Sequence, residues 1–361
     1  MKYNTTLIVG KNKTGKTRKI IFKELEEKIK NKENLYILDN NKEYYNHFYN
    51  KLKDNDYVIQ VVNFKEPTKS DGWNPLSYPA YLRNEGKLDD SIEVLESMAN
   101  EIFYQEKEED PFWRLMSENL FIGLSLLLYR IGEKVDDRHL YEFPTIMLLL
   151  KIGEEKYKDS TVLKKYLESL DPIDPIYIAL SPIVFAPPET KGSILSVFKT
   201  KINLYLLREE LVKSFTNSSY SEAKVSNTSF KNHAIFIIGN DSLNRFTNIV
   251  IENSFREALN NSRKSTFILD EFDKLPKMLE IKYMINKANR YNIDLYLTAT
   301  TMDNIIDKYG KLDNVQQTIE TKDYYETNNK DENIKIDDQE RNHYYENNYI
   351  DKLRKEILST I

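Results

Sequence analysis

The chain has 361 residues and a formal net charge of −5, so it lacks the overall basic charge typical of nucleic-acid-binding domains. Any contact with nucleic acid would therefore have to be local. It contains no cysteine, which excludes disulfides, zinc–thiolate sites and thiol catalysis, and its four histidines are scattered without metal-ligand spacing. The hydrophobic content of 40% is ample for the core of one large domain or two.

The first apolar run, residues 5–10, predicts a buried strand that leads into a phosphate-binding loop. Residues Gly10 to Thr17 read GKNKTGKT, which fits the form GxxxxGK[ST], and a helical pattern follows to about residue 30. In this setting, backbone N–H groups converge on phosphate oxygens at a helix N-terminus. We expect a nucleoside triphosphate with Mg²⁺, with Lys16 on the β- and γ-phosphates and Thr17 on the metal. The predicted nucleotide-binding residues are Gly10, Lys13, Thr14, Gly15, Lys16 and Thr17.

The rest of the chain falls into a strand-and-helix part on each side of a helical part. Strands are predicted at residues 35–39, 57–63, 234–239, 266–270 and 293–299, with a Tyr-rich helix that runs to about residue 52. The intervening helices are predicted at residues 92–104, 111–131, 145–152 and 192–207. Strands that alternate with helices indicate a parallel sheet, so we predict an α/β fold with an inserted all-helical domain.

These patterns give the predicted domain boundaries. A nucleotide-binding domain in two parts, residues 1–88 and 202–310, flanks an all-α insertion at 89–201. Residues 311–361 are predicted to be a polar, partly disordered tail, closed by a short amphipathic helix at 349–358 that docks, frays or binds a partner.

The chain shows no evident membrane segment. The apolar run from Leu120 to Leu128 is shorter than the ~20 residues that span a bilayer, so it predicts a buried helix. No signal peptide is visible. We therefore expect a soluble chain.

Two adjacent carboxylates supply the acidic part of the predicted site. The apolar run at 266–269 ends in Asp270 and Glu271, as expected of a strand that reaches the carboxyl edge of a parallel sheet. We expect Asp270 to hold Mg²⁺, through water, and Glu271 to orient or deprotonate the attacking water. A dedicated water-activating carboxylate favours hydrolysis over transfer to a small metabolite.

Several separate motifs resemble those of the conjugative coupling proteins, the TraG/TraD-type ATPases of type IV secretion. They are the phosphate loop, Trp73-Asn74-Pro75-Leu76, Asp110-Pro111-Phe112-Trp113, Thr190-Lys191-Gly192-Ser193-Ile194, Phe267 to Pro276 (FILDEFDKLP), and Arg290-Tyr291-Asn292-Ile293 followed by Lys308-Tyr309-Gly310. The phosphate motifs are shared with many ATPases, whereas WNPL together with DEFxxLP is much more specific. The resemblance covers about residues 5 to 310.

The resemblance implies a RecA-like P-loop ATPase domain that forms a homo-hexameric ring and hydrolyses ATP with Mg²⁺. The ring would pump single-stranded DNA, or hand a relaxase–DNA complex to the type IV secretion channel. Its helical insertion would face the cytoplasm and help select the substrate. The chain would be cytoplasmic and peripheral at the inner face of the bacterial cell membrane.

The sequence departs from the family pattern at three places. The usual two N-terminal transmembrane helices are not present, so membrane attachment would rely on a partner or on an anchor missing from this sequence. Thr300 occupies the position of a Gln that senses the γ-phosphate, and a shorter hydroxyl would reach it only through water or a shifted backbone. The sequence after Gly310 does not follow the final family strand, so the sheet is either shortened or completed by the tail.

Further residues match family positions without a decided role. Arg290 is a candidate for the cation that one subunit offers to the γ-phosphate of its neighbour, with an ordinary surface arginine as the alternative. Asp39 and Glu43 lie on and after the second strand, where a structural cap is as plausible as a site role.

The sequence leaves other functions open. A ring ATPase that moves protein substrates is favoured by the acidic overall charge. A nucleotide-binding adaptor with little turnover is suggested by Thr300 and the unusual tail, although Lys16 and Glu271 argue against it. A small-molecule kinase is poorly supported, because the helical insertion has no obvious acceptor site.

Overall fold

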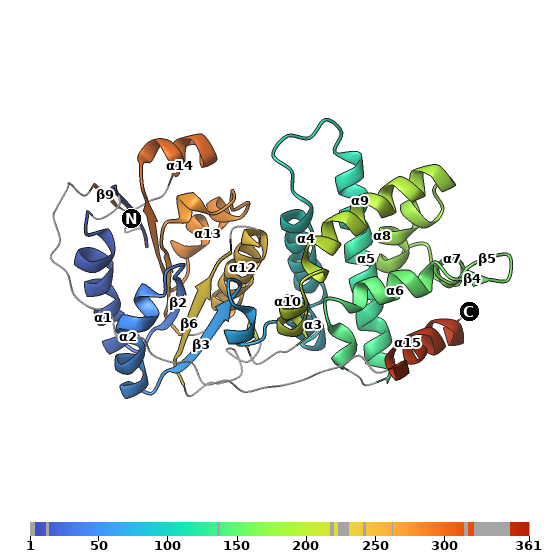
Figure 1. The fold of residues 1–361 in the computed structure, drawn as a ribbon, viewed down its shortest axis with the longest axis horizontal. Helices are drawn as coiled ribbons and strands as arrows, with labels where there is room; N and C mark the ends of the chain where they lie inside the picture. The colour runs from blue at the N-terminus through green and yellow to red at the C-terminus, as the bar shows by residue number, and fades with distance from the viewer. Residues whose placement is uncertain are drawn as a thin grey trace. The chain divides into compact units, whose positions relative to one another are not determined.

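The computed structural model describes residues 4–11, 14–135, 138–216, 220–222, 231–240, 243–261, 263–313, 317–320 and 347–360. The chain forms two compact units (Figure 1). The first, the α/β unit, comprises Met1–Asp71 and Glu222–Asp338, and the second, the helical unit, comprises Gly72–Ser221 and Gln339–Ile361.

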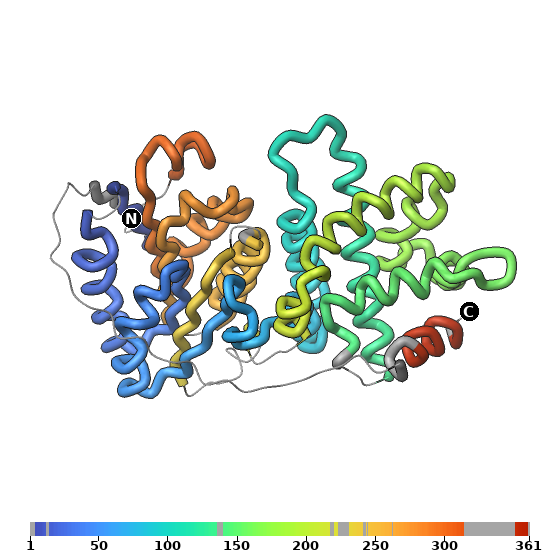
Figure 2. The backbone as a smooth tube through the Cα atoms, viewed as in Figure 1, coloured from blue at the N-terminus to red at the C-terminus, as the bar shows by residue number. Residues whose placement is uncertain are grey.

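The α/β unit is built on a seven-stranded sheet whose paired strands are all parallel, in the order β3-β6-β2-β7-β8-β1-β9. Its strands are β1 (Thr5–Val9), β2 (Asn34–Leu38), β3 (Val58–Asn63), β6 (His233–Ile238), β7 (Ser265–Leu269), β8 (Ile293–Ala299) and β9 (Gln317–Glu320). Its helices are η1 (Lys16–Ile21), α1 (Phe22–Lys30), α2 (Glu43–Asp54), η2 (Pro67–Lys69), α12 (Asn244–Asn260), η4 (Phe272–Lys274), α13 (Ile281–Ala288) and α14 (Met302–Tyr309). Segments from the two ends of the sequence thus lie side by side, as β1 and β8 do (Figure 2).

Alternating side chains of the strands bury both faces of this sheet. On one face, Phe22 of α1 and Phe48 of α2 pack over Ile37 and its neighbours in a single apolar cluster. On the other face, Phe267 of β7 contacts Phe255 of α12 edge-on, with ring centroids 5.3 Å apart. A sheet covered on both faces explains why its strands read as continuous apolar runs.

A buried cluster of charges ties the amino ends of three neighbouring strands together. The carboxylate of Glu33, 2% exposed, lies 3.8 Å from the ammonium of Lys28 and 3.5 Å from that of Lys264. The Thr266 hydroxyl donates to its other oxygen at 2.6 Å. Asp294 accepts from both lysines. Every charge of the cluster therefore has an opposite partner, which offsets the cost of burying it.

Removing Glu33 is expected to destabilise the α/β unit. Glu33→Ala leaves two lysines without one of their counter-charges, and we expect a loss of about 3 kcal/mol in the free energy of unfolding. Glu26→Ala is the control, because Glu26 pairs with Lys51 on the surface, and it should change stability by less than about 1 kcal/mol. Urea unfolding of the two variants measures the difference, and equal midpoints would contradict a structural role for the cluster.

The helical unit contains the whole of the predicted insertion. Its elements are α3 (Ser77–Asn84), α4 (Leu88–Phe103), α5 (Phe112–Val135), η3 (Arg138–Tyr141), α6 (Thr145–Gly153), β4 (Lys156–Tyr157), β5 (Ser160–Thr161), α7 (Val162–Glu168), α8 (Pro175–Val184), α9 (Pro188–Leu206), α10 (Glu209–Phe215) and α15 (Asn347–Thr360). It is wider at both ends than the 89–201 range predicted from the sequence.

The WNPL segment explains the earlier start of the helical unit. Trp73 is fully buried, stands edge-on to Phe215, and donates its backbone N–H to Ser214 at 2.9 Å. Asn74 donates its side-chain amide to the carbonyl of Tyr141 at 2.7 Å. The segment therefore anchors α3 within the helical unit, and its contacts are those of a structural element.

The segment after Gly310 is more structured than predicted where the structure describes it. β9 pairs in parallel with β1 and extends the sheet at its edge, so the sheet is not shortened there. α15 covers the predicted helix at 349–358 and packs against α7, with Leu353 and Ile357 buried. Arg354 donates to both carboxylate oxygens of Glu155, at 2.8 and 3.0 Å. This part of the tail docks on the helical unit through apolar contacts and a bidentate ion pair.

No helix among the described residues is long and apolar enough to cross a bilayer. The run from Leu120 to Leu128 lies inside α5, where most of its side chains are buried in the helical unit. This agrees with the expectation that the run forms a buried helix.

Candidate nucleotide site at the carboxyl edge of the sheet

The phosphate-binding loop follows β1 at the carboxyl edge of the sheet. Gly15 has φ +85°, in the left-handed region, and a Cβ there would lie 2.8 Å from the Lys19 side chain. The Thr14 hydroxyl donates to the Lys11 carbonyl at 2.9 Å. Because Lys13 and its neighbour at position 12 lie outside the described residues, the predicted contact of Lys13 with nucleotide stays a prediction.

Lys16 is only 7% exposed and lies under this loop. Its ammonium donates to the carbonyl of Gly10 and, at 3.0 Å, to that of Lys11. Burial lowers the pKa of Lys16, and the negative charges of Asp270 and Glu271 counteract part of that shift. The two carboxylates thus favour the charged form of Lys16, which can exchange its loop carbonyls for the oxygens of a polyphosphate anion.

Asp270 lies where the loop and β7 come together. One carboxylate oxygen is 3.5 Å from the hydroxyl of Thr17, and the other accepts a hydrogen bond from Thr298 at 2.5 Å. Thr298 also accepts from the backbone N–H of Glu271 at 2.8 Å. Burial raises the pKa of Asp270, while the bond from Thr298 opposes the rise. Thr298 is fully buried on β8, the strand between β1 and β7, and sequence reasoning missed it.

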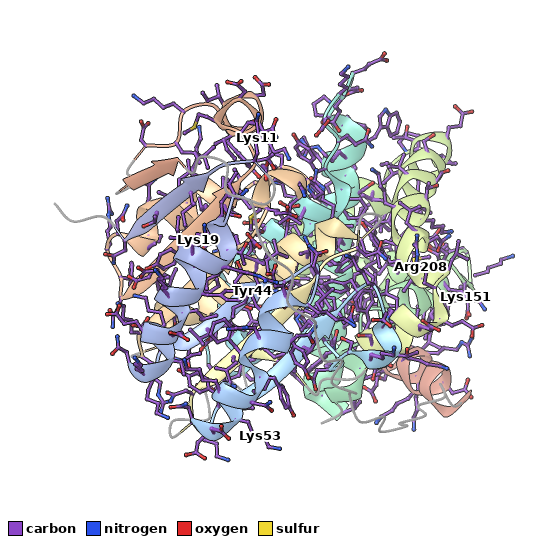
Figure 3. All side chains as sticks on the ribbon, turned by 60° about the vertical axis from the view of Figure 1, so that its left-hand side comes forward. Lys11, Lys19, Tyr44, Lys53, Lys151 and Arg208 are labelled. Atoms are coloured by element: carbon purple, nitrogen blue, oxygen red, sulfur yellow. The ribbon has the colours of Figure 1, made fainter. Side chains whose placement is uncertain are left out.

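Tyr44 of α2 is a second residue that sequence reasoning missed. It is 1% exposed, and its ring packs edge-on against Phe22 (Figure 3 shows α2 beside the helix that carries Lys19). Its hydroxyl is buried beside the side chains of Thr17 and Asp270, and hydrogen bonding to these two side chains is among the causes that set its pKa. Burial raises its pKa well above the usual range, with the charge of Asp270 as the next cause. This neutral hydroxyl can donate to a ligand bound between Thr17 and Asp270.

Asp39 follows β2 and acts as a cap for α2. Its carboxylate is 2% exposed and accepts from the backbone N–H of Tyr45 at 2.8 Å. Glu43, by contrast, pairs with exposed Arg18 at 2.8 Å. Burial raises the pKa of Asp39 to about 7, and the charge of Asp270 adds to the rise.

The raised pKa of Asp39 predicts a pH-dependent stability. The folded chain binds a proton at Asp39 up to about pH 7, whereas the unfolded carboxyl loses it near 3.8. Stability therefore falls as pH rises between these values, by at most about 1.4 kcal/mol per pH unit. Asp39→Asn keeps an acceptor for the Tyr45 N–H and does not titrate. Its free energy of unfolding should therefore rise relative to that of the wild type as the pH increases from 4 to 7. Urea unfolding across this range tests it, and a pH-independent difference would contradict the burial argument.

Glu271 has an unusual backbone and an ion-pair partner. Its φ of +51° is left-handed, which is costly for a residue with a side chain and often marks functional sites. Its carboxylate accepts from Lys274 at 2.6 Å, on an exposed turn. To act on a water at the γ-phosphate, the Glu271 carboxylate would have to leave this lysine.

The structure places Thr300 and Arg290 at opposite ends of β8. Thr300 follows the strand at the carboxyl edge, and its backbone N–H donates to Asp273 at 3.0 Å. Arg290 is exposed and precedes β8 at the amino edge. The seven residues of β8 span about 20 Å, so Arg290 is not brought to Lys16 of the same chain.

The residues present fit a magnesium–nucleotide complex better than a metal alone. No group of three or more His, Asp or Glu among the described residues is arranged to hold a metal ion. Thr17 and Asp270 nevertheless offer two oxygens beside an anion-binding loop. Mg²⁺ is commonly held by one or two protein oxygens, with substrate phosphates and water supplying the rest.

Comparison with known proteins agrees with this geometry. The parallel sheet, with a phosphate-binding loop at its carboxyl edge and one strand between β1 and β7, defines a RecA-like P-loop fold. The family model for type IV secretory system conjugative DNA transfer matches residues 4–338. The chain belongs to this family, as the resemblance of its motifs predicted. No curated protein matches the chain in sequence.

Solved structures share the fold at low sequence identity. The bacterial conjugative coupling protein TrwBdeltaN70 with sulphate has a TM-score of 0.58 and 15% identity, over 85% of this chain and 65% of that one. TrwB with ADP and Mg²⁺ has a TM-score of 0.57 and 15% identity, over 85% and 66%. VirB4 of Thermoanaerobacter pseudethanolicus has a TM-score of 0.51 and 14% identity, over 88% and 77%. The chain thus spans just under two thirds of the two TrwB chains. These likenesses confirm the predicted α/β fold.

Proposed function

We propose that the chain is the ATP-hydrolysing motor part of a conjugative coupling protein, which delivers single-stranded DNA or a relaxase–DNA complex to a type IV secretion channel. The observation that carries the proposal is that Asp270 lies beside the phosphate loop. Its carboxylate is 3.5 Å from the Thr17 hydroxyl and accepts a hydrogen bond from Thr298 on the intervening strand. Membership of the conjugative DNA transfer family supports the substrate class. Contact with the membrane would be made through a partner or an additional anchor.

The chain's own residues divide the work of hydrolysis among them. Bound ATP with Mg²⁺ would supply the γ-phosphoryl group and neutralise its charge. Lys16 would exchange its loop carbonyls for phosphate oxygens, and Thr17 and Asp270 would hold the metal. Glu271 would orient the attacking water or accept its proton once it leaves Lys274. Thr300 would contribute to hydrolysis by holding the start of the segment between β8 and α14 in place, through its backbone hydrogen bond to Asp273.

A homo-hexameric ring would give Arg290 a role. Because Arg290 is exposed at the amino edge, it can serve only the nucleotide of a neighbouring subunit. We propose that it contacts that neighbour's γ-phosphate. An arginine supplied in this way is worth about 10³- to 10⁵-fold in rate in phosphoryl-transfer enzymes.

A ring ATPase that moves protein substrates is the second candidate, because the net charge of −5 provides no general attraction for DNA. The salt dependence of single-stranded DNA binding separates the two. A DNA motor that neutralises about four phosphates should show a slope near −3 for log K against log[salt]. The assay uses fluorescent oligonucleotides with and without a non-hydrolysable ATP analogue, with Lys16→Ala as the nucleotide-site control. A flat slope, or no binding, would favour the protein motor.

A further inference from the structure

Asp273 joins the turn after β7 to the helix after β8. Its side chain is 6% exposed, and one carboxylate oxygen accepts from the Thr300 backbone N–H at 3.0 Å and from the Asn304 amide at 3.1 Å. The first donor immediately precedes the N-cap residue of α14, and the second is a side-chain amide in the first turn of the helix. Asp273 thus fixes the N-terminal end of α14 to the turn that carries Asp270 and Glu271.

Lys308, at the other end of α14, makes the reverse connection. Its ammonium donates to the backbone carbonyls of Asp273 and, at 2.6 Å, of Leu275. These carbonyls lie in and just after η4, the short helix of the same turn. α14 is therefore attached to the turn at both ends, and the two elements are expected to move together.

The turn that carries Asp273 also belongs to the nucleotide site, because Asp270 and Glu271 precede Asp273 by three and two residues. The charge of Asp273 adds a smaller attraction on Lys16, after the charges of Asp270 and Glu271. Its second carboxylate oxygen is buried and has no hydrogen-bond partner in the described part of the structure. A displacement of Asp270 or Glu271 will be passed along this short turn to Asp273 and to its two bonds with the start of α14. Nucleotide binding would make such a displacement, because Asp270 would turn to the metal and Glu271 would leave Lys274.

We propose that Asp273 is a positioning residue that couples the nucleotide site to α14, so that α14 responds to the nucleotide bound beside Lys16. The inference rests on the proposed nucleotide site. α14 has an exposed face that includes Asp303 and Ile306, the latter 51% exposed. A neighbouring molecule bound to this face would be affected by a movement of α14.

Hydrogen exchange of the α14 amides, with and without a non-hydrolysable ATP analogue and Mg²⁺, tests the coupling. In the wild type, nucleotide should change the exchange rates of Met302–Tyr309 by about fivefold or more. Asp273→Ala should reduce this response to less than about twofold, whereas Asp273→Asn should keep it, because the amide oxygen can accept both bonds. Asn304→Ala removes only one bond and should give an intermediate response. Asp303→Ala, on the exposed face of the same helix, is the matched control and should behave as the wild type.

Nucleotide binding measured separately by equilibrium dialysis distinguishes the possible failures. If the wild type binds no nucleotide, both the proposed function and this coupling are wrong. If it binds and α14 does not respond, the coupling alone is wrong. A response in Asp273→Ala equal to that of the wild type, or loss in Asp273→Asn as complete as in Asp273→Ala, would also overturn it. In hydrolysis, Asp273→Ala should lower kcat by about tenfold with KM nearly unchanged, and Asp273→Asn should restore most of it.

Discussion

Glu271→Gln is expected to lower kcat for ATP hydrolysis by about 10²- to 10⁴-fold while nucleotide binding stays close to that of the wild type. Glutamine keeps the size of the side chain but cannot accept a proton from the attacking water. The left-handed backbone at Glu271 and the Thr298 bond to its N–H do not depend on the carboxylate, so the turn should persist. Single-turnover hydrolysis together with binding of a labelled ATP analogue measures both quantities.

Lys274→Met is the control for this variant. It removes the ion pair with Glu271 but leaves the carboxylate in place, so activity should be retained or rise. Turnover that survives Glu271→Gln would contradict the assignment of Glu271, and it would direct attention to Asp273 as the nearest buried carboxylate of the same turn.

Thr298→Val is expected to raise the Mg²⁺ concentration needed for half-maximal hydrolysis by about 10- to 100-fold. Valine has nearly the shape of threonine, so the strand and its packing should remain. It lacks the hydroxyl that donates to Asp270 at 2.5 Å and accepts from the Glu271 N–H at 2.8 Å. Asp270 would then lose the contact that orients its oxygen toward Thr17. Hydrolysis rates measured across a Mg²⁺ titration give the result.

Thr298→Ser supplies the matched comparison, because it keeps the hydroxyl and removes only a methyl group. It should stay within about threefold of the wild type in the same titration. If valine and serine behave alike, the hydroxyl does not position Asp270, and the contact is only part of the packing of β8.

The sequence predicted the strands well because each is an apolar run bounded by polar residues. Each strand predicted from the sequence lies within one residue of its observed bounds at both ends, as with β7 at Ser265–Leu269. The phosphate loop was equally easy to predict, because all its residues are contiguous in the sequence. β9 was missed because its four residues, Gln317–Glu320, show no apolar pattern and gain their order from pairing with β1.

The parts of the site that were missed depend on strand order, which the sequence does not reveal. Thr298 and Asp270 are 28 residues apart in the chain and meet only because β8 is the neighbour of β7. Tyr44 is one of many tyrosines, and nothing in the sequence marks it as adjacent to Thr17. A hydroxyl residue inside the apolar run of β8 was the available signal for Thr298, because a buried hydroxyl requires a partner.

ATP hydrolysis by the purified chain, with and without single-stranded DNA and beside Lys16→Ala, tests the central proposal most directly. We expect hydrolysis that DNA stimulates about tenfold or more and that Lys16→Ala abolishes. Hydrolysis unaffected by DNA would shift the function to a protein-moving ring. Nucleotide binding without hydrolysis, at concentrations where rings form, would contradict the motor and favour an adaptor.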